Sequence, residues 1–256
     1  MKIILLASES IASNILFNSL NKKIKIEKVF IENSVGKRSF LKTRLRKVGF
    51  IRLIDQLLFI ILINNILKFF SKSRIDKLKK QNNLDAKNIP KKLIKKIDSV
   101  NSDNSIEEIR NYNVDFIIIC GTRIISSKLI NSLNARIINI HAGITPQYRG
   151  VHGAYWAIIS NDIKNAGVTL HYVDKGVDTG KIISQSTIDI KSLDNFSTYP
   201  ILQLSKGIEL LVNFLESHYS NKKLNILKSR NLKESKQWYH PGFLEYLFYY
   251  IFYGKK

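Results

Sequence analysis

Cysteine, proline and glycine are all scarce in this sequence. The single cysteine, Cys120, excludes a disulfide framework and any zinc or iron-sulfur site with several thiolate ligands. Four prolines and 12 glycines among 256 residues exclude collagen-like and proline-rich chains. A chain with one thiol fits a reducing compartment, so we expect a cytoplasmic protein.

Signals for export and for membrane insertion are also weak. The first ten residues, MKIILLASES, hold only a short apolar run, which predicts a first strand and not a signal peptide. The most apolar stretch, 50–70, has an uncharged run of twelve residues at 56–67, fewer than the roughly twenty that span a bilayer. We therefore expect no transmembrane helix.

Acidic residues are few, 20 against 41 lysines and arginines, and the formal net charge is +21. The excess is concentrated, because residues 37–96 hold eighteen lysines and arginines and only three acids. Such a block is typical of an electropositive face for anionic lipid, nucleic acid or phosphorylated ligands. A compositional bias of the source genome is the alternative interpretation.

The apolar material that is present suffices for a core, since 45% of the residues are hydrophobic, which excludes a wholly disordered chain. Apolar β-rich runs alternate with helical spacing, which predicts an α/β fold with a mainly parallel sheet and helices on both faces. We expect a main domain at 1–220 and a C-terminal appendage at 221–256. Strands are predicted at 2–6, 26–31, 116–119, 137–140, 168–173 and 182–190, and helices at 10–20, 124–133, 152–160 and 200–218.

The basic block interrupts this alternation as a helical insertion over about 37–96. Its central helix is mostly apolar all round and has basic residues on both sides, so it must be covered by something. Two interpretations stay open for 37–80. The segment is either a helical hairpin packed on its own domain or an interfacial helix that contacts the inner face of an anionic membrane.

Three polar residues are candidates for chemistry. Asn139 and His141 lie two apart at the end of an apolar strand, so both side chains point to the same side, at the sheet edge where parallel sheets bind ligands. Asp178 follows a later strand in a glycine-flanked loop that can turn tightly. An amide, an imidazole and a carboxylate that converge would suit acyl transfer, with oxyanion stabilisation and proton transfer.

Two motifs give these residues a family context. The patterns N-x-H-x-G-x-x-P-x-Y-R-G at 139–150 and G-x-T-x-H-x-x-D-x-G-x-D-T-G at 167–180 resemble those of the folate-dependent formyltransferases. That family includes glycinamide ribonucleotide, methionyl-tRNA and nucleotide-sugar formyltransferases. The resemblance covers roughly 114–190. It implies a Rossmann-like formyltransferase domain, 10-formyltetrahydrofolate as the donor, a primary amine as the acceptor, and no metal.

The resemblance also implies residue roles. Asn139, His141 and Asp178 match the catalytic positions, where protonated histidine and asparagine would stabilise the oxyanion while the aspartate assists removal of the amine proton. The residues expected to bind the folate form two loops, Gly121, Thr122, Arg123, Ile124 and Ile125 on one side and Val173, Asp174 and Gly176 on the other. Those expected beside the acceptor are Tyr148, Arg149 and Gly150.

Departures from the family pattern reduce the number of acceptors that we expect. The first strand ends in Ala7-Ser8-Glu9-Ser10, without the glycine-rich phosphate loop of the glycinamide ribonucleotide enzymes, and only 38 residues follow His218, too few for the RNA-binding domain of the methionyl-tRNA enzymes. We therefore expect a small anionic amine, an amino sugar on a nucleotide or lipid carrier in surface polysaccharide synthesis, and no nucleic acid partner. The alternatives are the other two formyltransferases, a folate deformylase, or a non-catalytic membrane-surface protein.

Four further residues are expected to have structural roles. Cys120 is expected to be a buried apolar residue, and Trp156 is expected to belong to the core. His152 and His171 suggest a metal site with His141, but their spacing does not match metal-ligand patterns. The sequence does not predict an oligomeric state.

Overall fold

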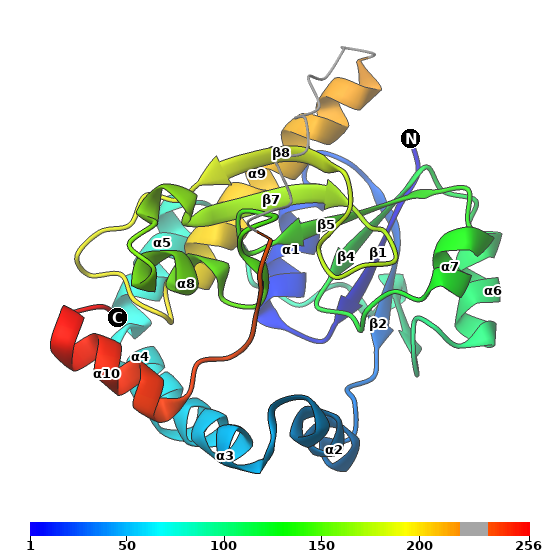
Figure 1. Ribbon diagram of the computed structural model, residues 1–256. Helices are drawn as coiled ribbons and strands as arrows, with labels where there is room; N and C mark the ends of the chain where they lie inside the picture. The colour runs from blue at the N-terminus through cyan, green and yellow to red at the C-terminus, as the bar shows by residue number, and fades with distance from the viewer. Residues whose placement is uncertain (221–234) are drawn as a thin grey trace.

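A seven-stranded sheet runs through the protein, which a computed structural model describes over residues 1–220 and 235–256 (Figure 1). The strand order is β3-β2-β1-β4-β5-β7-β8. The first five strands in this order are parallel, and β7 is antiparallel to both β5 and β8. The strands are β1 (Ile3–Ser8), β2 (Ile26–Glu32), β3 (Ile94–Ile97), β4 (Phe116–Cys120), β5 (Arg136–His141), β7 (Gly167–Tyr172) and β8 (Ile182–Thr187).

Helices cover both faces of this sheet. On one face, α1 (Ile11–Asn21) and α9 (Tyr199–Tyr219) bury their apolar sides. On the other face, α6 (Asp103–Asn111) and α7 (Ser127–Ser132) do the same. The mainly parallel α/β fold is therefore confirmed, and so are all six predicted strands and the helices predicted at 10–20, 152–160 and 200–218. The helix expected at 124–133 is shorter and begins only at Ser127.

The insertion between β2 and β3 forms a helical layer, most of which lies along the lower margin of Figure 1. Its helices are α2 (Lys37–Val48), α3 (Phe50–Leu58), the π-helical turn η1 (Phe59–Ile63), α4 (Asn64–Phe70) and α5 (Lys72–Gln81). α3, η1 and α4 run on as one helix, because the residues at both junctions keep right-handed helical geometry. The segment 37–80 is thus built from several helices, of which the central one is continuous over Phe50–Phe70.

The continuous helix formed by α3, η1 and α4 is both long and apolar. Phe50–Phe70 has 21 residues and a mean hydropathy of 1.8, so by length and composition it could cross a membrane. It is the one helix of this kind in residues 1–220 and 235–256, and length and composition alone are weak support for a span. The expectation that no helix spans a membrane therefore stays a prediction.

Two polar contacts anchor the layer to the rest of the protein. The guanidinium group of Arg74 in α5 makes two 2.9 Å hydrogen bonds to Asp194, whose side chain is fully buried. The side-chain amide of Gln56 in α3 donates a 2.7 Å hydrogen bond to the carbonyl oxygen of His240. Each contact joins segments more than a hundred residues apart, so the insertion has a fixed place on the domain.

The described C-terminal residues, 235–256, also pack closely. β9 (Gln237–Trp238) pairs with β6 (Arg149–Gly150), and α10 (Phe243–Tyr253) lies beside α3 and η1. An aromatic core joins α8 (Gly153–Ile159) to α10 and η1. In it, Trp156 is buried and stacks on Trp238 with ring centroids 4.7 Å apart, as its predicted core role requires. Residues 221–234 of the expected appendage lie outside the described part of the chain.

Candidate active site

Two neighbouring strands place three polar side chains on one face of the sheet. Asn139 and His141 alternate with apolar residues on β5, and His171 lies on β7 directly opposite Asn139 in the strand register. Because side chains two apart point to the same face, all three lie on the side that also carries α6 and α7. His141 and His171 are almost fully buried, with 4% and 3% of their surfaces exposed.

The loop after β7 brings Asp178 to these residues. β7 runs antiparallel to β5, and the Val173 amide still continues this pairing with a 2.8 Å hydrogen bond to the Ile137 carbonyl. The chain must then fold back across this face to reach His141. Asp178 has a left-handed backbone conformation (φ 53°), which aspartate tolerates better than most residues. One carboxylate oxygen, Oδ2, lies 3.3 Å from Nδ1 of His141, and the other, Oδ1, lies 3.4 Å from the Asn139 amide nitrogen.

The β6 strand holds this loop in place. The Gly150 amide donates a 2.9 Å hydrogen bond to Oδ2 of Asp178, and the Arg149 guanidinium donates a 3.0 Å bond to the Val177 carbonyl. Both residues were expected beside the acceptor. In the structure, their hydrogen bonds hold the loop that carries Asp178.

Tyr148, the third residue expected beside the acceptor, has a buried side chain. Its hydroxyl donates to Asp162 at 2.9 Å, and burial raises its pKa to about 12. Its carbonyl oxygen lies 2.7 Å from Nε2 of His141. The structure therefore assigns Tyr148 a role in packing and in orienting His141 through its main chain.

The electrostatics of the pair His141 and Asp178 favour proton transfer. Both ring nitrogens of His141 face oxygen atoms, an arrangement that only the doubly protonated ring satisfies completely. Burial nevertheless lowers the pKa of His141, against the attraction of Asp178 and the Tyr148 carbonyl, so the ring gives up its proton readily. Burial would raise the pKa of Asp178, but His171, His141 and the Gly150 amide together lower it, which keeps the carboxylate ionised.

A pocket of about 350 Å³ opens beside these residues on the α6 and α7 side of the sheet. The two loops expected to bind the folate form its walls, with Asn139, His141 and His171 between them. Gly121 is required here, because its φ is +70° and a Cβ would lie 2.6 Å from the Ser8 hydroxyl. The predicted residues that line this pocket are Gly121, Thr122, Arg123, Ile124, Ile125, Val173, Asp174 and Gly176.

Two of the residues expected to bind the folate also stabilise the local structure. The Arg123 guanidinium donates a 2.7 Å bond to the buried carboxylate of Glu32, and its amide donates to the same group at 2.8 Å. Asp174 accepts hydrogen bonds from the Gly176 amide and the Thr179 hydroxyl, which shape the loop. Glu32 thus holds both the side chain and the amide of Arg123.

A second and larger cavity, of about 760 Å³, lies on the opposite face of the sheet. Its walls come from α1, α9 and the inserted helices α4 and α5, and it shares Ile119, Gly121 and Asn139 with the first pocket. The lining is mostly apolar. Lys68 and Lys72 of the insertion contribute positive charge, and Lys79 pairs with Asp76, which also lines the cavity, at 3.6 Å. The two pockets therefore meet at the amide of Asn139.

Sequence reasoning missed two parts of this site. His171 was considered only as a metal ligand, yet its Nε2 lies 3.7 Å from Asp178 Oδ1 and 3.2 Å from the Asn139 amide nitrogen. A signal was available, because Thr169 and His171 are polar residues at alternate positions of an otherwise apolar strand. The basic block at 37–96 was a signal for the positive charge of the larger cavity, but which of its lysines line the cavity depends on the tertiary fold that brings α4 and α5 next to β5.

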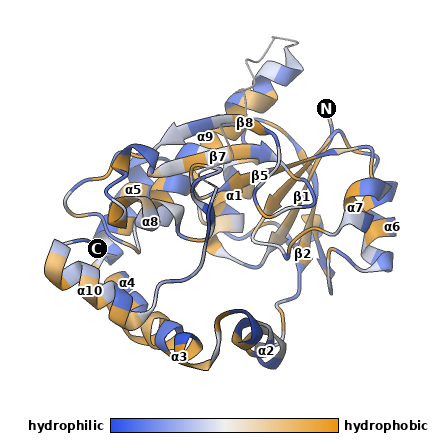
Figure 2. Ribbon diagram, viewed as in Figure 1, coloured by the Kyte–Doolittle hydropathy of each residue, from blue (hydrophilic) through white to orange (hydrophobic). Residues whose placement is uncertain are grey.

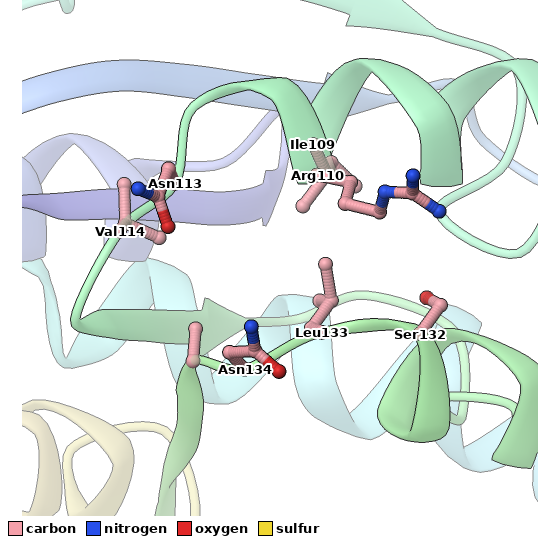
Figure 3. A pocket seen from close by; sticks show the side chains of 8 residues that line it. Ile109, Arg110, Asn113, Val114, Ser132, Leu133 and Asn134 are labelled. Carbon is pink, nitrogen blue, oxygen red and sulfur yellow. The ribbon is translucent and has the colours of Figure 1, made fainter.

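Other features of the described residues do not extend the site. Cys120 is a poor nucleophile, because burial raises the pKa of its thiol. Its sulfur accepts a 3.7 Å hydrogen bond from the Ser13 hydroxyl. A separate hollow of about 310 Å³ lies between α6 and the start of β5 (Figure 3). It is at the N-terminal ends of β4 and β5, whereas Asn139 lies near the C-terminal end of β5. In residues 1–220 and 235–256, no group of three or more histidine, cysteine or acidic side chains is placed to hold a metal ion.

Sequence relatives match part of this chain. One is a phosphoribosylglycinamide formyltransferase of Bacillus subtilis, 38% identical over 94 residues, which are 36% of this chain and 48% of the relative. Another is a methionyl-tRNA formyltransferase of Azobacteroides pseudotrichonymphae, 35% identical over 107 residues, or 42% of this chain and 33% of the relative. The chain thus spans between a third and a half of the length of these relatives.

Solved structures share the fold across most of the chain. A 4-N formyltransferase from Francisella tularensis has a TM-score of 0.54 at 20% identity and covers 92% of this chain and 75% of its own. An N-formyltransferase from Helicobacter canadensis, solved with folinic acid and dTDP-3-aminofucose, has a TM-score of 0.54 at 17% identity and covers 93% and 71%. The formyl transferase family model matches residues 65–213, more than half of the sequence, and the chain belongs to this family.

Proposed function

We propose that the protein transfers a formyl group from 10-formyltetrahydrofolate to the primary amine of an anionic amino sugar. The observation that carries this proposal is the contact of Asn139, His141 and Asp178 at the junction of two pockets. A transferase needs its donor and acceptor to meet at one set of polar groups, and this junction is such a place. The solved Helicobacter canadensis relative, whose structure holds a folate and an amino-sugar nucleotide, supports the same pairing.

The smaller pocket suits the folate. Two loops form its walls, and main-chain groups of Gly121 and Ile125 can face the polar edge of a flat ring while Val173 covers the opposite side. The formyl carbon would then lie next to Asn139 and His141. The folate supplies an activated one-carbon group at this position.

The site residues divide the proton chemistry among them. When the substrates bind, the Asn139 amide would turn from Asp178, and Nε2 of His141 from the Tyr148 carbonyl, to donate hydrogen bonds to the formyl oxygen as negative charge develops on it. Asp178, kept ionised by its neighbours, accepts the proton that the amine loses as its nitrogen bonds to the formyl carbon. That proton is passed on to the folate nitrogen that leaves, so the net charge of the site is unchanged.

The larger cavity supports an anionic acceptor. In the described part of the chain, Lys68 and Lys72 line this cavity without an ion-pair partner. By contrast, the N-terminus of α1 is a poor phosphate site, because the Ser10 hydroxyl already accepts the Ser13 amide and Glu9 adds negative charge. A phosphate or diphosphate carried by the sugar would therefore bind toward the inserted helices and place the amine near Asn139.

A panel of amines tests the proposal. The wild-type protein is incubated with 10-formyltetrahydrofolate and each candidate, namely nucleotide-linked amino sugars, a lipid-linked amino sugar, glycinamide ribonucleotide and methionyl-tRNA, and products are identified by mass spectrometry. Asp178→Asn preserves the left-handed backbone but removes the charge, so it should lower turnover by at least about a hundredfold. The matched control Asp103→Asn removes an exposed carboxylate away from the site and should keep full activity.

The lysines give a separate readout. Lys72→Ala should raise the KM for the acceptor by about tenfold and leave the KM for the folate unchanged, because removal of one phosphate contact weakens binding on one side only. Lys80→Ala, on the same helix but outside the cavity lining, should change neither value. Formylation of methionyl-tRNA in preference to every amino sugar, or of no amine at all, would overturn the assignment.

A further inference from the structure

The long helix of the insertion presents a continuous apolar stripe to solvent. Its large apolar side chains recur every three or four residues, each between 41% and 84% exposed. Figure 2 shows this hydrophobic colouring along α3 and on the neighbouring α10. We define the apolar stripe as Phe50, Ile51, Ile54, Leu58, Ile61, Leu62, Ile66, Phe69 and Phe70, together with Leu244, Phe248, Ile251 and Phe252 of α10.

The opposite side of the same helix is firmly held. Leu53, Gln56 and Phe59 are buried, and the Phe59 ring packs against Tyr246 of α10 with centroids 5.2 Å apart. Arg52 also pairs with Glu245 at 2.9 Å. α3 and α10 therefore form one rigid layer, and the apolar stripe is its outer face. Isolated exposed apolar residues are common, but a patch of this size on a soluble protein marks an interaction surface.

The charges around the apolar stripe indicate the kind of surface that it fits. Lys42, Arg46 and Lys47 are exposed on α2 beside one end of the long helix. Lys68 and Lys72, which also line the larger cavity, are exposed at its other end. Residues 37–72 contain nine lysines and arginines and one acid, Asp55, which accepts a hydrogen bond from the Leu244 amide. An apolar face between basic ends is complementary to a surface that has an apolar interior beneath a layer of negative charge.

The same charges argue against two other occupants. In a symmetric pair of copies, the basic ends of one stripe would meet those of the other, which brings like charges together. A helix that spanned a bilayer would have to leave Tyr246 and break the Gln56 bond to His240. We propose that the apolar stripe docks the folded protein on the surface of an anionic phospholipid bilayer, with the long helix lying in the plane of the interface.

Vesicle sedimentation tests this proposal, and it does so independently of the formyl-transfer reaction. The full chain is mixed with phosphatidylcholine vesicles or with vesicles that also contain phosphatidylglycerol. We expect the pelleted fraction to rise with phosphatidylglycerol content and to fall as salt screens the basic residues. Phe69→Ser with Phe70→Ser should lower the partition coefficient by about tenfold or more, because both rings lose their burial in the interface.

Matched variants separate docking from general effects of composition. Ile163→Ser with Leu193→Ser removes two equally exposed apolar side chains elsewhere and should leave sedimentation unchanged. Arg46→Glu with Lys47→Glu should lower the partition coefficient by at least about tenfold, whereas Lys91→Glu with Lys92→Glu, the same charge change outside the helical layer, should have a much smaller effect. All of these positions are exposed, so melting temperatures should stay close to that of the wild type.

Three results would overturn the proposal. The first is no sedimentation of the wild type with any vesicle at low salt. The second is a dimer in analytical ultracentrifugation that Phe69→Ser with Phe70→Ser dissociates, which would make a second copy the occupant. The third is protein that stays in the pellet after high-salt and alkaline washing, which would indicate a helix inserted across the bilayer.

Discussion

At the scale of single residues, the carboxylate of Asp178 organises the site. It contacts His141, His171, Asn139 and the Gly150 amide, so four groups from three segments depend on one side chain. A carboxylate with several donors stays ionised despite its burial. The ionisation of Asp178 therefore depends on His171, His141 and the Gly150 amide, whether or not these groups touch a substrate.

His171 allows this idea to be tested. We expect His171 to be a positioning residue that lowers the pKa of Asp178, so His171→Gln should raise that pKa toward its usual value. The acid limb of the kcat profile should then move to higher pH, because Asp178 becomes protonated sooner as the pH falls. The measurement is kcat for formyl transfer as a function of pH, with His218→Gln in α9 as the control. An acid limb that stays in place in His171→Gln would contradict this role.

The sequence predicted part of this constellation. The alternation of Asn139 and His141 on an apolar strand indicates a common face, and that much follows from strand geometry alone. The place of Asp178 does not, because the loop after β7 must fold back across the sheet, and only the pairing of β7 with β5 shows this. Tyr148 illustrates a second limit, since no local pattern tells a buried phenol from one that faces a substrate.

At the scale of elements, close packing of α9 on the sheet sets the shape of the larger cavity. Gly207 in α9 lies directly over β5, and a Cβ on this residue would be 2.2 Å from the Cγ2 methyl of Ile140. The helix can approach β5 this closely only because that position has no side chain.

Gly207→Ala should therefore destabilise the fold by about 2 kcal/mol. Alanine gains up to about 1 kcal/mol of helix propensity, but the steric overlap exceeds that gain. Urea unfolding measures the change, and Gly36→Ala, where a Cβ meets no atom within 4 Å, should be nearly neutral. Equal stability of the two variants would show that α9 can move away from β5 at little cost.

A buried histidine pair joins α8 to the C-terminal segment and predicts a pH dependence of stability. Nε2 of His152 lies 2.9 Å from Nδ1 of His240, and burial lowers their pKa values to about 3 and about 4. The unfolded chain binds protons at these positions below about pH 6.5 while the folded chain does not, so acid favours unfolding. Each histidine should then remove about 2 kcal/mol from the free energy of unfolding at pH 5 relative to neutral pH.

The variant His152→Asn makes this effect measurable. His152 has a φ of 59°, a conformation that asparagine tolerates, so the backbone should be preserved. The free energy of unfolding of the variant, from urea titrations at several pH values, should fall less steeply between pH 6.5 and pH 4. A slope equal to that of the wild type would show that the pair does not control the acid response.

Elements were predictable where a local period reveals them. The six predicted strands are apolar runs, whereas β3 was missed because Lys95 and Lys96 interrupt its pattern, and α6 was missed because its sequence is mostly polar. The pairing of β9 with β6 joins residues 88 positions apart, and no period in the sequence encodes it. The two-sided character of the long helix likewise depends on α10, which covers one side.

At the scale of the whole molecule, the protein combines a formyltransferase fold with a helical layer that has its own surface. The layer contributes Lys68 and Lys72 to the larger cavity on one side and the apolar stripe on the other. Changes in the insertion can therefore alter both the larger cavity and the outer face, whereas none of the inserted helices lines the smaller pocket.

The shared wall between the two pockets has a kinetic consequence. Because the pockets meet at Asn139 from opposite faces of the sheet, donor and acceptor can be bound at the same time. A formyl group held on the enzyme would need a nucleophile at that junction, and the thiol of Cys120 is a poor one because burial raises its pKa. Initial rates measured with both substrates varied should give intersecting double-reciprocal lines, the pattern of a ternary complex. Parallel lines would instead require a formylated enzyme, released from the folate before the amine arrives.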